Sequence, residues 1–261
     1  MIKLIVTDVD GTLLTEGTSE PQPQITETVR SLMKKGITFA FASGRSYESI
    51  LGVFPELDDE AVFISNNGAC VTEKGQTIVS YAMDRETVAD VVSYIRSVSG
   101  SNILVTTEKY SYTESTDKEF IDWIRYGYSI DLQCVENVLE IHEPIVKLAM
   151  FIGGIDAAVA SEAAKKHFGN KISVMGAGRH WVDFIRDDVD KGNAVVKLQE
   201  KLGITRHETM TFGDNLNDIG LMKCAEYGCA VYGARQEVKD AAHEVLPDED
   251  YAVLNKMKEF L

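Results

Sequence analysis

The sequence lacks the features that mark secreted and membrane-spanning proteins. Its four cysteines are scattered and form no CxxC pair: Cys70, Cys134, Cys224 and Cys229. This spacing predicts free thiols in a reducing compartment, with neither a disulfide framework nor a cysteine metal site. No run of 18 uncharged apolar residues occurs, and the first apolar run stops at Asp8, which argues against a transmembrane helix and a signal peptide. We therefore expect a cytoplasmic protein with no membrane partner.

Basic residues are scarce. The sequence has 26 lysines and arginines but 41 aspartates and glutamates, which gives a formal net charge of −15. Such a surface repels nucleic-acid backbones and anionic lipids, so we expect neither as a partner. An anionic substrate would need a local cationic site. The length of 261 residues and the hydrophobic share of 44% suit a soluble protein that buries its own core.

Short apolar runs alternate with helical patterns at both ends of the chain. The expected elements are a strand at Ile2–Thr7, a helix through Ile25, Val29 and Leu32, strands at Ile37–Ala42 and Ala61–Ile64, a helix at Asn193–Leu202 and a strand at Glu208–Phe212. Strand–helix–strand alternation implies parallel strands with right-handed crossovers. The fold class predicted is therefore α/β, a doubly wound parallel-sheet (Rossmann-like) core formed by residues 1–83 and 187–261.

The middle of the chain has a different order of predicted helices and strands. After a hairpin at Ala69–Tyr81, the pattern predicts helices at Glu86–Val98, Phe120–Tyr128 and Asp156–Phe168, and strands at Ile103–Thr107, Val146–Ile152, Ile172–Met175 and Trp181–Ile185. His180 and Trp181, near the end of this segment, either face the cleft or belong to the core, and we favour a buried Trp181. Residues 84–186 are thus expected to form an α+β domain inserted into the first.

Polar clusters follow the predicted buried strands of the core. Asp8 and Asp10 follow the first strand, Ser43-Gly44-Arg45 the second, and Gly213–Asp218 a later one, while Lys191 begins a helix just after the insert. In an open parallel sheet, the loops after the strand ends line one shared crevice. We therefore expect these residues to converge, although they lie far apart in sequence.

Their chemistry suits a metal ion and a phosphate. The carboxylates of Asp8, Asp10 and Asp214 would repel one another unless a dication such as Mg²⁺ neutralised them. A hydroxyl at Ser43, the backbone N–H groups of Gly11 and Gly44, and the charge of Lys191 complement a phosphate. Phosphoryl transfer needs such positioning and charge stabilisation, and an aspartate can serve as its nucleophile.

The same residues carry a family resemblance. Asp8-Val9-Asp10-Gly11-Thr12, Phe41-Ala42-Ser43-Gly44-Arg45, Lys191-Gly192 and Gly213-Asp214-Asn215-Leu216-Asn217-Asp218 resemble the four ordered motifs of the haloacid dehalogenase-like (HAD) hydrolases. Asn67-Gly68-Ala69 and the large insert are similar to the Cof-type sugar-phosphatase branch, in which the insert is a type IIB cap. The chain departs from that branch at Tyr232-Gly233-Ala234, where Gly-Asn-Ala is usual.

The resemblance implies catalytic and metal roles. Asp8 would be the nucleophile and a magnesium ligand. Asp10 would protonate the leaving alcohol, activate water and give its backbone carbonyl to the metal. Ser43 would hydrogen-bond the transferring phosphoryl group, Lys191 would stabilise its charge, and Asp214 would complete the metal site.

It also implies supporting roles around the phosphate. Asn217 would reach toward the phosphate, Asp218 would support the metal site, and Thr12 would orient the first loop. Arg45 either binds substrate or pairs with an acid, and the sequence leaves both readings open.

The resulting hypothesis is a magnesium-dependent phosphatase of small phosphorylated metabolites, sugar phosphates or nucleotide-like cofactors, that acts through an aspartyl-phosphate. A phosphomutase of the same superfamily is the alternative among enzymes, although mutases typically show a different second motif. A phosphoacceptor signalling domain is a further alternative, but it is about half this length, as befits one small domain.

Overall fold

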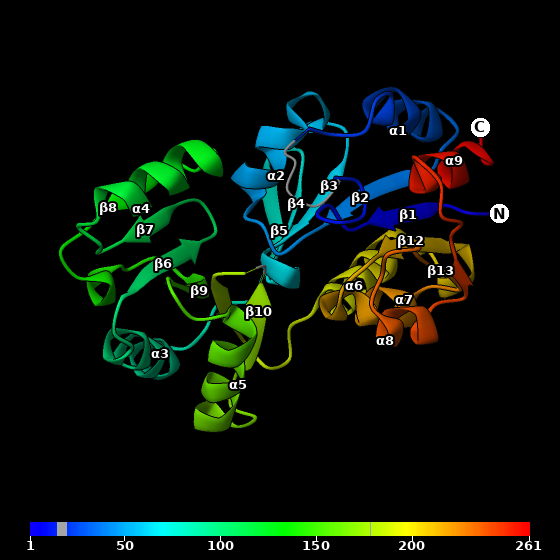
Figure 1. The fold of residues 1–261 in the computed structure, drawn as a ribbon. Helices are drawn as coiled ribbons and strands as arrows, with labels where there is room; N and C mark the ends of the chain where they lie inside the picture. Colours follow the sequence, from blue (N-terminus) through cyan, green and yellow to red (C-terminus); the bar gives the residue numbers. More distant parts are fainter. Residues whose placement is uncertain (15–19, 178) are drawn as a thin grey trace. The chain divides into compact units, whose positions relative to one another are not determined.

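The chain divides into two compact units in a computed structural model that describes residues 1–14, 20–177 and 179–261 (Figure 1). The first unit comprises Met1–Val79 and Asp190–Leu261, and the second comprises Ser80–Val189. The sequence places the boundaries a few residues inside the insert, at 83/84 and 186/187.

The first unit is built on an eight-stranded sheet with the order β14-β13-β12-β1-β2-β3-β4-β5. Its strands are β1 (Leu4–Thr7), β2 (Thr38–Ala42), β3 (Val62–Ser65), β4 (Cys70–Glu73), β5 (Gln76–Ser80), β12 (Thr209–Gly213), β13 (Tyr227–Ala230) and β14 (Glu244–Val245). The strands from β14 to β3 pair in parallel, and β4 pairs with β3 in the antiparallel sense. The central strand β1 has parallel neighbours on both sides, so the ends of β12, β1 and β2 lie at one edge.

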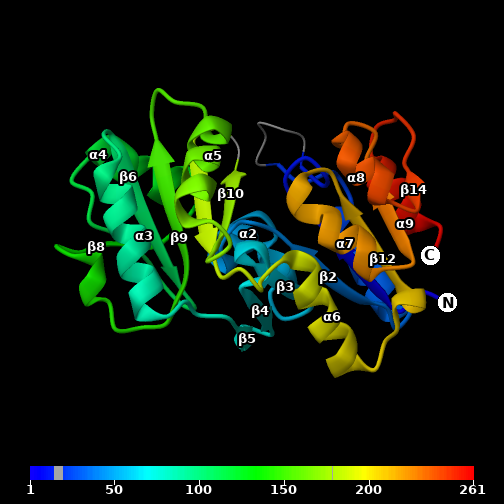
Figure 2. The ribbon, with the colours of Figure 1, turned by 90° about the horizontal axis from the view of Figure 1, so that it is seen from below.

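Helices cover both faces of this sheet. One face packs on α1 (Ile25–Lys34), α2 (Tyr47–Val53) and α9 (Ala252–Lys258), and the other on α6 (Lys191–Leu202), α7 (Ile219–Cys224) and α8 (Gln236–Ala241). Figure 2 shows α6 and α7 in front of the strands. Alternation along β1 supplies both cores, because Ile5 belongs to the first and Leu4 and Val6 to the second. Such a sheet is doubly wound, which confirms the predicted fold class of the core.

The second unit is a six-stranded sheet with the order β10-β11-β9-β6-β7-β8. Its elements are α3 (Arg85–Ser97), β6 (Ser101–Thr107), β7 (Ser111–Thr113), α4 (Lys118–Asp122), a π-helix (Trp123–Gly127), β8 (Leu132–Cys134), β9 (Ile145–Ile152), α5 (Ala157–Phe168), β10 (Ser173–Ala177) and β11 (Trp181–Ile185). The pairs are antiparallel except β7 with β8. Helices α3 and α5 cover one face, as Figure 2 shows, and α4 with the π-helix packs on the other.

Two features of this unit differ from the expected elements. Strands β7 and β8 were not predicted, because three residues each are too few to show a period. The helical stretch expected over Phe120–Tyr128 changes from α to π geometry after Asp122. Across the π turn the Trp123 ring lies against Gly127, where an added Cβ would sit 3.1 Å from the indole.

The remaining helical elements are short 3-10 turns: η1 (Pro55–Leu57), η2 (Asn66–Gly68), η4 (Val138–Glu140), η5 (Arg206–Glu208) and η6 (Leu216–Asp218). Of the helices in the described part of the chain, none combines the length and the apolar character that a bilayer crossing requires.

Candidate active site

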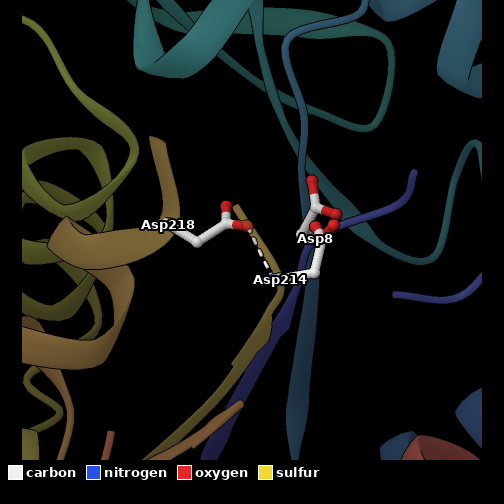
Figure 3. A group of neighbouring side chains, drawn as sticks. All are labelled: Asp8, Asp214 and Asp218. Carbon is white, nitrogen blue, oxygen red and sulfur yellow. Dashed lines mark hydrogen bonds between the residues drawn. The ribbon is translucent and has the colours of Figure 1, made fainter. Parts of the chain in front are cut away.

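Three aspartates meet at the edge where β1 and β12 end. Asp8 follows β1, Asp214 follows β12, and Asp218 closes η6 just before α7 (Figure 3). One carboxylate oxygen from each lies within 4.8 Å of the other two. Because β1 and β12 run in parallel, the sheet itself brings together residues that are 206 positions apart.

Lys191 neutralises part of this charge. Its Nζ donates to Oδ1 of Asp8 at 2.6 Å and to Oδ1 of Asp218 at 2.7 Å, and its side chain is completely buried. Burial alone lowers the pKa of Lys191, but the charges of Asp218 and Asp8 outweigh that effect and hold the pKa above its usual value. The ammonium group therefore stays charged inside the protein.

The start of α6 fixes the position of this lysine. Lys191 is the first residue of the helix, and the preceding Asp190 caps it by accepting the N–H of Asn193 at 2.7 Å. Gly192 allows α6 to approach α7 closely, since a Cβ there would lie 2.5 Å from the backbone of Gly220. In the Lys191-Gly192 pair, the lysine thus supplies the charge and the glycine allows the close contact between α6 and α7.

The two oxygens of Asp8 have different surroundings. Oδ1 accepts from Lys191, whereas Oδ2 is buried and has no hydrogen-bond partner among the described residues. Burial raises the pKa of Asp8 well above its usual value despite Lys191, and the charges of Asp218 and Asp214 add to the increase. A buried carboxylate oxygen with open lone pairs is where a cation or a reacting atom is expected.

The carboxylate of Asp214 lies next to that of Asp8, and its pKa is also shifted. Burial, reinforced by the charge of Asp218, raises the pKa of Asp214 to about 6. Thr12 donates weakly to its Oδ1, at 3.5 Å. Gly11 has a φ of +79° and an ideal Cβ would lie 2.4 Å from Oδ2 of Asp214, so the first loop accepts the carboxylate only because this residue is glycine.

Asp218 holds the other groups in place. Its Oδ2 accepts the backbone N–H groups of Asp214 at 3.0 Å and Asn215 at 3.1 Å, while its Oδ1 accepts from Lys191. Both oxygens are therefore already occupied by donors, and Asp218 orients Lys191 and the turn after β12. The sequence assigned it a supporting role, and these contacts favour that role.

The charge balance indicates how a metal would fit. Three carboxylates and one ammonium in this cluster leave a formal charge of −2. Among the described residues, Asp8 has a buried oxygen without a donor, and the partly exposed Asp214 has only the weak donor Thr12. Hard dications with oxygen ligands, such as Mg²⁺, are bound in proteins by one or two carboxylates, the remaining positions being water and phosphate. The donor set therefore fits the predicted ion. The side chain of Asp10 stands outside the cluster, so its predicted metal contact depends on its backbone carbonyl.

Asp10 is instead paired with Arg45. The guanidinium donates from Nε to Oδ2 at 2.8 Å and from Nη2 to Oδ1 at 2.7 Å, and the Asp10 side chain is 53% exposed. Of the two readings of Arg45, this structure shows the pairing with an acid. Ser43 is buried below, and its Oγ accepts the Arg45 N–H at 3.2 Å.

The predicted donor at Gly11 is engaged elsewhere in this structure. Its N–H donates to the carbonyl of Leu14 at 2.8 Å, within the turn that closes the first loop. This glycine therefore makes room for Asp214, and its amide does not point its hydrogen at a ligand.

Asn67 belongs to the triplet Asn67-Gly68-Ala69 that carried the resemblance, but no role in the site was predicted for it. Its side-chain oxygen accepts from Nδ2 of Asn217 at 2.9 Å, and its N–H donates to the carbonyl of Ser43 at 2.9 Å. A Cβ added at Gly44 would lie 3.2 Å from its carboxamide. Asn67 thus joins the loops after β2, β3 and β12. The available signal was the pair Asn66-Asn67 after a strand, because asparagine tolerates the positive φ found at both positions.

Comparison with known proteins agrees with this geometry. A model of the haloacid dehalogenase-like hydrolase family matches residues 5–257. The chain is 25% identical to the 5-amino-6-(5-phospho-D-ribitylamino)uracil phosphatase YbjI of Escherichia coli, over 92% of this chain and 89% of that protein. It is 24% identical to the phosphatase YwpJ of Bacillus subtilis over the full length of both.

A solved structure from Eubacterium rectale superposes with a TM-score of 0.87 at 27% identity, over 100% of this chain and 99% of that one. The chain belongs to the haloacid dehalogenase-like hydrolase family, as its motifs predicted, and the names of its relatives support the predicted phosphatase activity.

Proposed function

We propose that this hydrolase is a magnesium-dependent phosphatase of small phosphorylated metabolites and that Asp8 is its nucleophile. The observation that carries the proposal is the asymmetry of the Asp8 carboxylate. One oxygen is held by a buried ammonium, and the other is buried without a partner among the described residues. Desolvation of this kind leaves a carboxylate oxygen ready to bond to an electrophile.

In the first step, a carboxylate oxygen of Asp8 forms a bond to phosphorus and the bond from phosphorus to the leaving oxygen breaks. Lys191, 2.6 Å from Asp8, lies where it can offset charge on the phosphoryl group. Asp8 and Asp214 would hold Mg²⁺, which supplies charge neutralisation for the phosphate when bound. Ser43 and Asn217 are the polar side chains proposed to bind the phosphoryl oxygens.

Asp10 is the proposed proton carrier. It gives a proton to the leaving alkoxide, and its carboxylate then removes a proton from the water that attacks the aspartyl-phosphate. The second step breaks the bond between Asp8 and phosphorus and releases inorganic phosphate. Both Asp10 oxygens now accept from Arg45, so the side chain must leave this partner to reach a leaving group.

The leaving group is proposed to be recognised by the second unit, 80–189, which corresponds to the type IIB cap domain that the family resemblance implies. YbjI acts on a phosphorylated ribitylaminouracil according to its name, so a ring-bearing phosphomonoester belongs among the candidates, together with sugar phosphates. At 25% identity the name of this relative supports the reaction class, and the panel below identifies the substrate.

Release of inorganic phosphate tests the proposal. The panel contains sugar phosphates, nucleoside monophosphates, pyridoxal phosphate and 5-amino-6-(5-phospho-D-ribitylamino)uracil, each with Mg²⁺ or with EDTA. We expect turnover only with Mg²⁺, and a loss of at least about a thousandfold in Asp8→Asn, because no nucleophile remains. The matched control is Asp248→Asn, which removes the same charge from an exposed position of the same unit.

Turnover that survives Asp8→Asn would contradict the assignment of the nucleophile. Conversion of a substrate to an isomer without phosphate release would indicate a phosphomutase instead. Activity that is unchanged in EDTA would remove the magnesium from the proposal.

A further inference from the structure

We infer that an aromatic face on the second unit binds a planar ring in the leaving group of the substrate. The face consists of Trp123, Tyr128, Phe151 and Trp181, which come from the π-helix, the turn after it, β9 and β11. The inference rests on the proposed function, because it names the class of phosphomonoester that the enzyme prefers: one whose alcohol carries a flat heterocycle.

Strand alternation places two of these rings on the same side of the sheet. On β11, Val182 and Phe184 belong to the core beneath α3 and α5, so Trp181 projects from the opposite side. Phe151 is the direct cross-strand partner of Trp181 on β9, and Met150 and Ile152 beside it belong to that same core. The rings of Trp181 and Phe151 are 5.3 Å apart.

The π-helix completes the aromatic face from above the sheet. Trp123 stacks on Trp181 with centroids 5.9 Å apart and an interplanar angle of 18°, and it lies 5.1 Å from Phe151. Tyr128 meets Trp123 edge-on at 5.2 Å, and its hydroxyl accepts from Nε1 of Trp181 at 3.1 Å. The indoles are therefore held in fixed orientations before any ligand arrives.

The aromatic face is open to solvent although it adjoins a buried core. Phe120 and Ile124, which pack beside it, are buried, whereas Trp123 is 39% exposed and Trp181 and Phe151 are partly exposed. A stacked, oriented indole that keeps this much surface is more than the packing of a small core needs. Exposed aromatic surface of this kind stacks on flat rings with little regard to their substituents.

Polar groups next to the aromatic face indicate what kind of ring it suits. Asp183 follows Trp181 on the same side of β11 and forms a buried ion pair with Lys147, its carboxylate lying 3.7 Å from Nζ, so neither side chain is open to a ligand. His180, whose ring is 5.8 Å from Phe151, has a buried Nδ1 with no partner among the described residues. An imidazole nitrogen without a partner in the described part of the chain, beside a stacking surface, complements a ring with hydrogen-bonding edges, such as a pyrimidine, better than a plain hydrocarbon.

The phosphate-handling side chains described above offer no such surface. Around Asp8 they are carboxylates, carboxamides, hydroxyls, a lysine and an arginine. These groups suit a metal and a phosphate and do not recognise the rest of the substrate. A flat ring in a leaving group finds no stacking surface among these side chains, whereas the aromatic face of the second unit is one.

Both tryptophans of the chain lie on the aromatic face, so its occupancy has a direct optical readout. The probes are uridine 5′-monophosphate and ribose 5-phosphate, which share the sugar phosphate and differ by the ring. Each is titrated into the full chain carrying Asp8→Asn, with Mg²⁺, and binding is followed by tryptophan emission and by calorimetry. We expect saturable quenching by the nucleotide alone, and an affinity about tenfold higher than that of ribose 5-phosphate.

Substitutions locate the effect. Trp123→Leu should bring the two affinities within about twofold of each other, and Trp123→Phe should restore part of the difference because a flat ring returns. Tyr126→Leu is the matched control, since Tyr126 belongs to the same π-helix and is 81% exposed. It should leave both affinities unchanged. Circular dichroism of each variant checks that the fold is retained.

Equal affinities of the two probes in the parent, or a nucleotide preference that survives Trp123→Leu, would overturn the inference. Failure of the proposed function looks different. In that case the enzyme releases no phosphate from any ester of the panel, whichever way the probes bind.

Discussion

Replacing Asp8, the proposed nucleophile, should stabilise the metal-free protein. Asp8→Asn removes one of three carboxylates gathered around one ammonium group. In the absence of metal the cluster carries excess negative charge in a buried place, and the raised pKa of Asp8 shows that its charged form is disfavoured there. Activity and stability are therefore expected to change in opposite directions.

The distances set the magnitude. Two unit charges 4.8 Å apart, the upper limit for Asp8 with each of Asp214 and Asp218, repel by about 3 kcal/mol at an effective dielectric constant of ~20. The two repulsions together roughly balance the attraction of about 6 kcal/mol from Lys191 at 2.6 Å. What remains is the desolvation of the carboxylate, which costs several kcal/mol even after relaxation. Because the neutral amide that replaces the carboxylate also costs some desolvation, we expect the variant to be more stable by about 1–3 kcal/mol.

Scanning calorimetry in EDTA and in saturating Mg²⁺ measures the effect. For a unit of this size about 1 kcal/mol corresponds to about 2–4 °C in Tm, so in EDTA the Asp8→Asn transition should lie several degrees above that of the parent. With Mg²⁺ the difference in Tm between variant and parent should become smaller or change sign, because ion binding stabilises the parent more than the variant.

Lys191→Met provides the opposite control. It leaves Asp8 and Asp218 buried without their cation, and the expected loss is about 3–5 kcal/mol. The reasoning is refuted if Asp8→Asn in EDTA melts several degrees below the parent, since attraction to Lys191 would then outweigh repulsion and desolvation together.

Two further predictions concern the proposed metal site. Because Asp214 has a pKa of about 6 without metal, protonation competes with the ion: isothermal titration should show Mg²⁺ affinity falling about tenfold per pH unit below about pH 6, and a constant affinity down to pH 5 would contradict this. The linked stability has the opposite sign, since a folded-state pKa above the ordinary 3.8 means that the metal-free protein gains stability as pH falls through that window. Gly11→Ala combines a positive φ with a Cβ 2.4 Å from Asp214, whereas Gly75→Ala has a positive φ and open space. Both should lose about 1–2 kcal/mol in denaturant unfolding, and only Gly11→Ala should also weaken Mg²⁺ binding by more than about tenfold. Equal Mg²⁺ affinities in the two variants would show that crowding at Asp214 has no effect.

The convergence of the site was predictable because it follows from sheet topology. A buried apolar run followed by Asp8, and another followed by Asp214, suffice to predict adjacent strand ends once the strands are parallel. The residue types then indicate phosphate and metal. None of this depends on side-chain conformation.

The pairings within the site could not be predicted in the same way. Arg45 has a long side chain that can reach several acids, and only the three-dimensional arrangement selects Asp10. The role of Asn67 depends on a left-handed backbone after β3 and on a carboxamide from another loop. Complete burial of Lys191 contradicts the usual behaviour of lysine, and two carboxylates distant in sequence make it possible.

The second unit was harder to predict because its short strands depend on their neighbours. Strand β8 has a single buried residue, Leu132, and is defined by its pairing with β7. Trp181 was interpreted as core; it packs against the small core under α4 and the π-helix but is only partly buried. Alternation alone shows that a residue changes sides, and does not show whether that side is covered.

The placement of β12 has a consequence for synthesis of the protein on the ribosome. The central strand β1 has β12 as one of its two partners, and β12 begins at Thr209. The second unit is contiguous from Ser80 to Val189, so its whole sequence has been made while β1 still lacks that partner. Since contiguous domains fold as units during translation, the later segment of this chain can reach its native state first. Until then the apolar strands β1, β2 and β3 lack β12, β13 and β14, three of the eight strands of their sheet, and exposed hydrophobic segments of this kind are what chaperones bind.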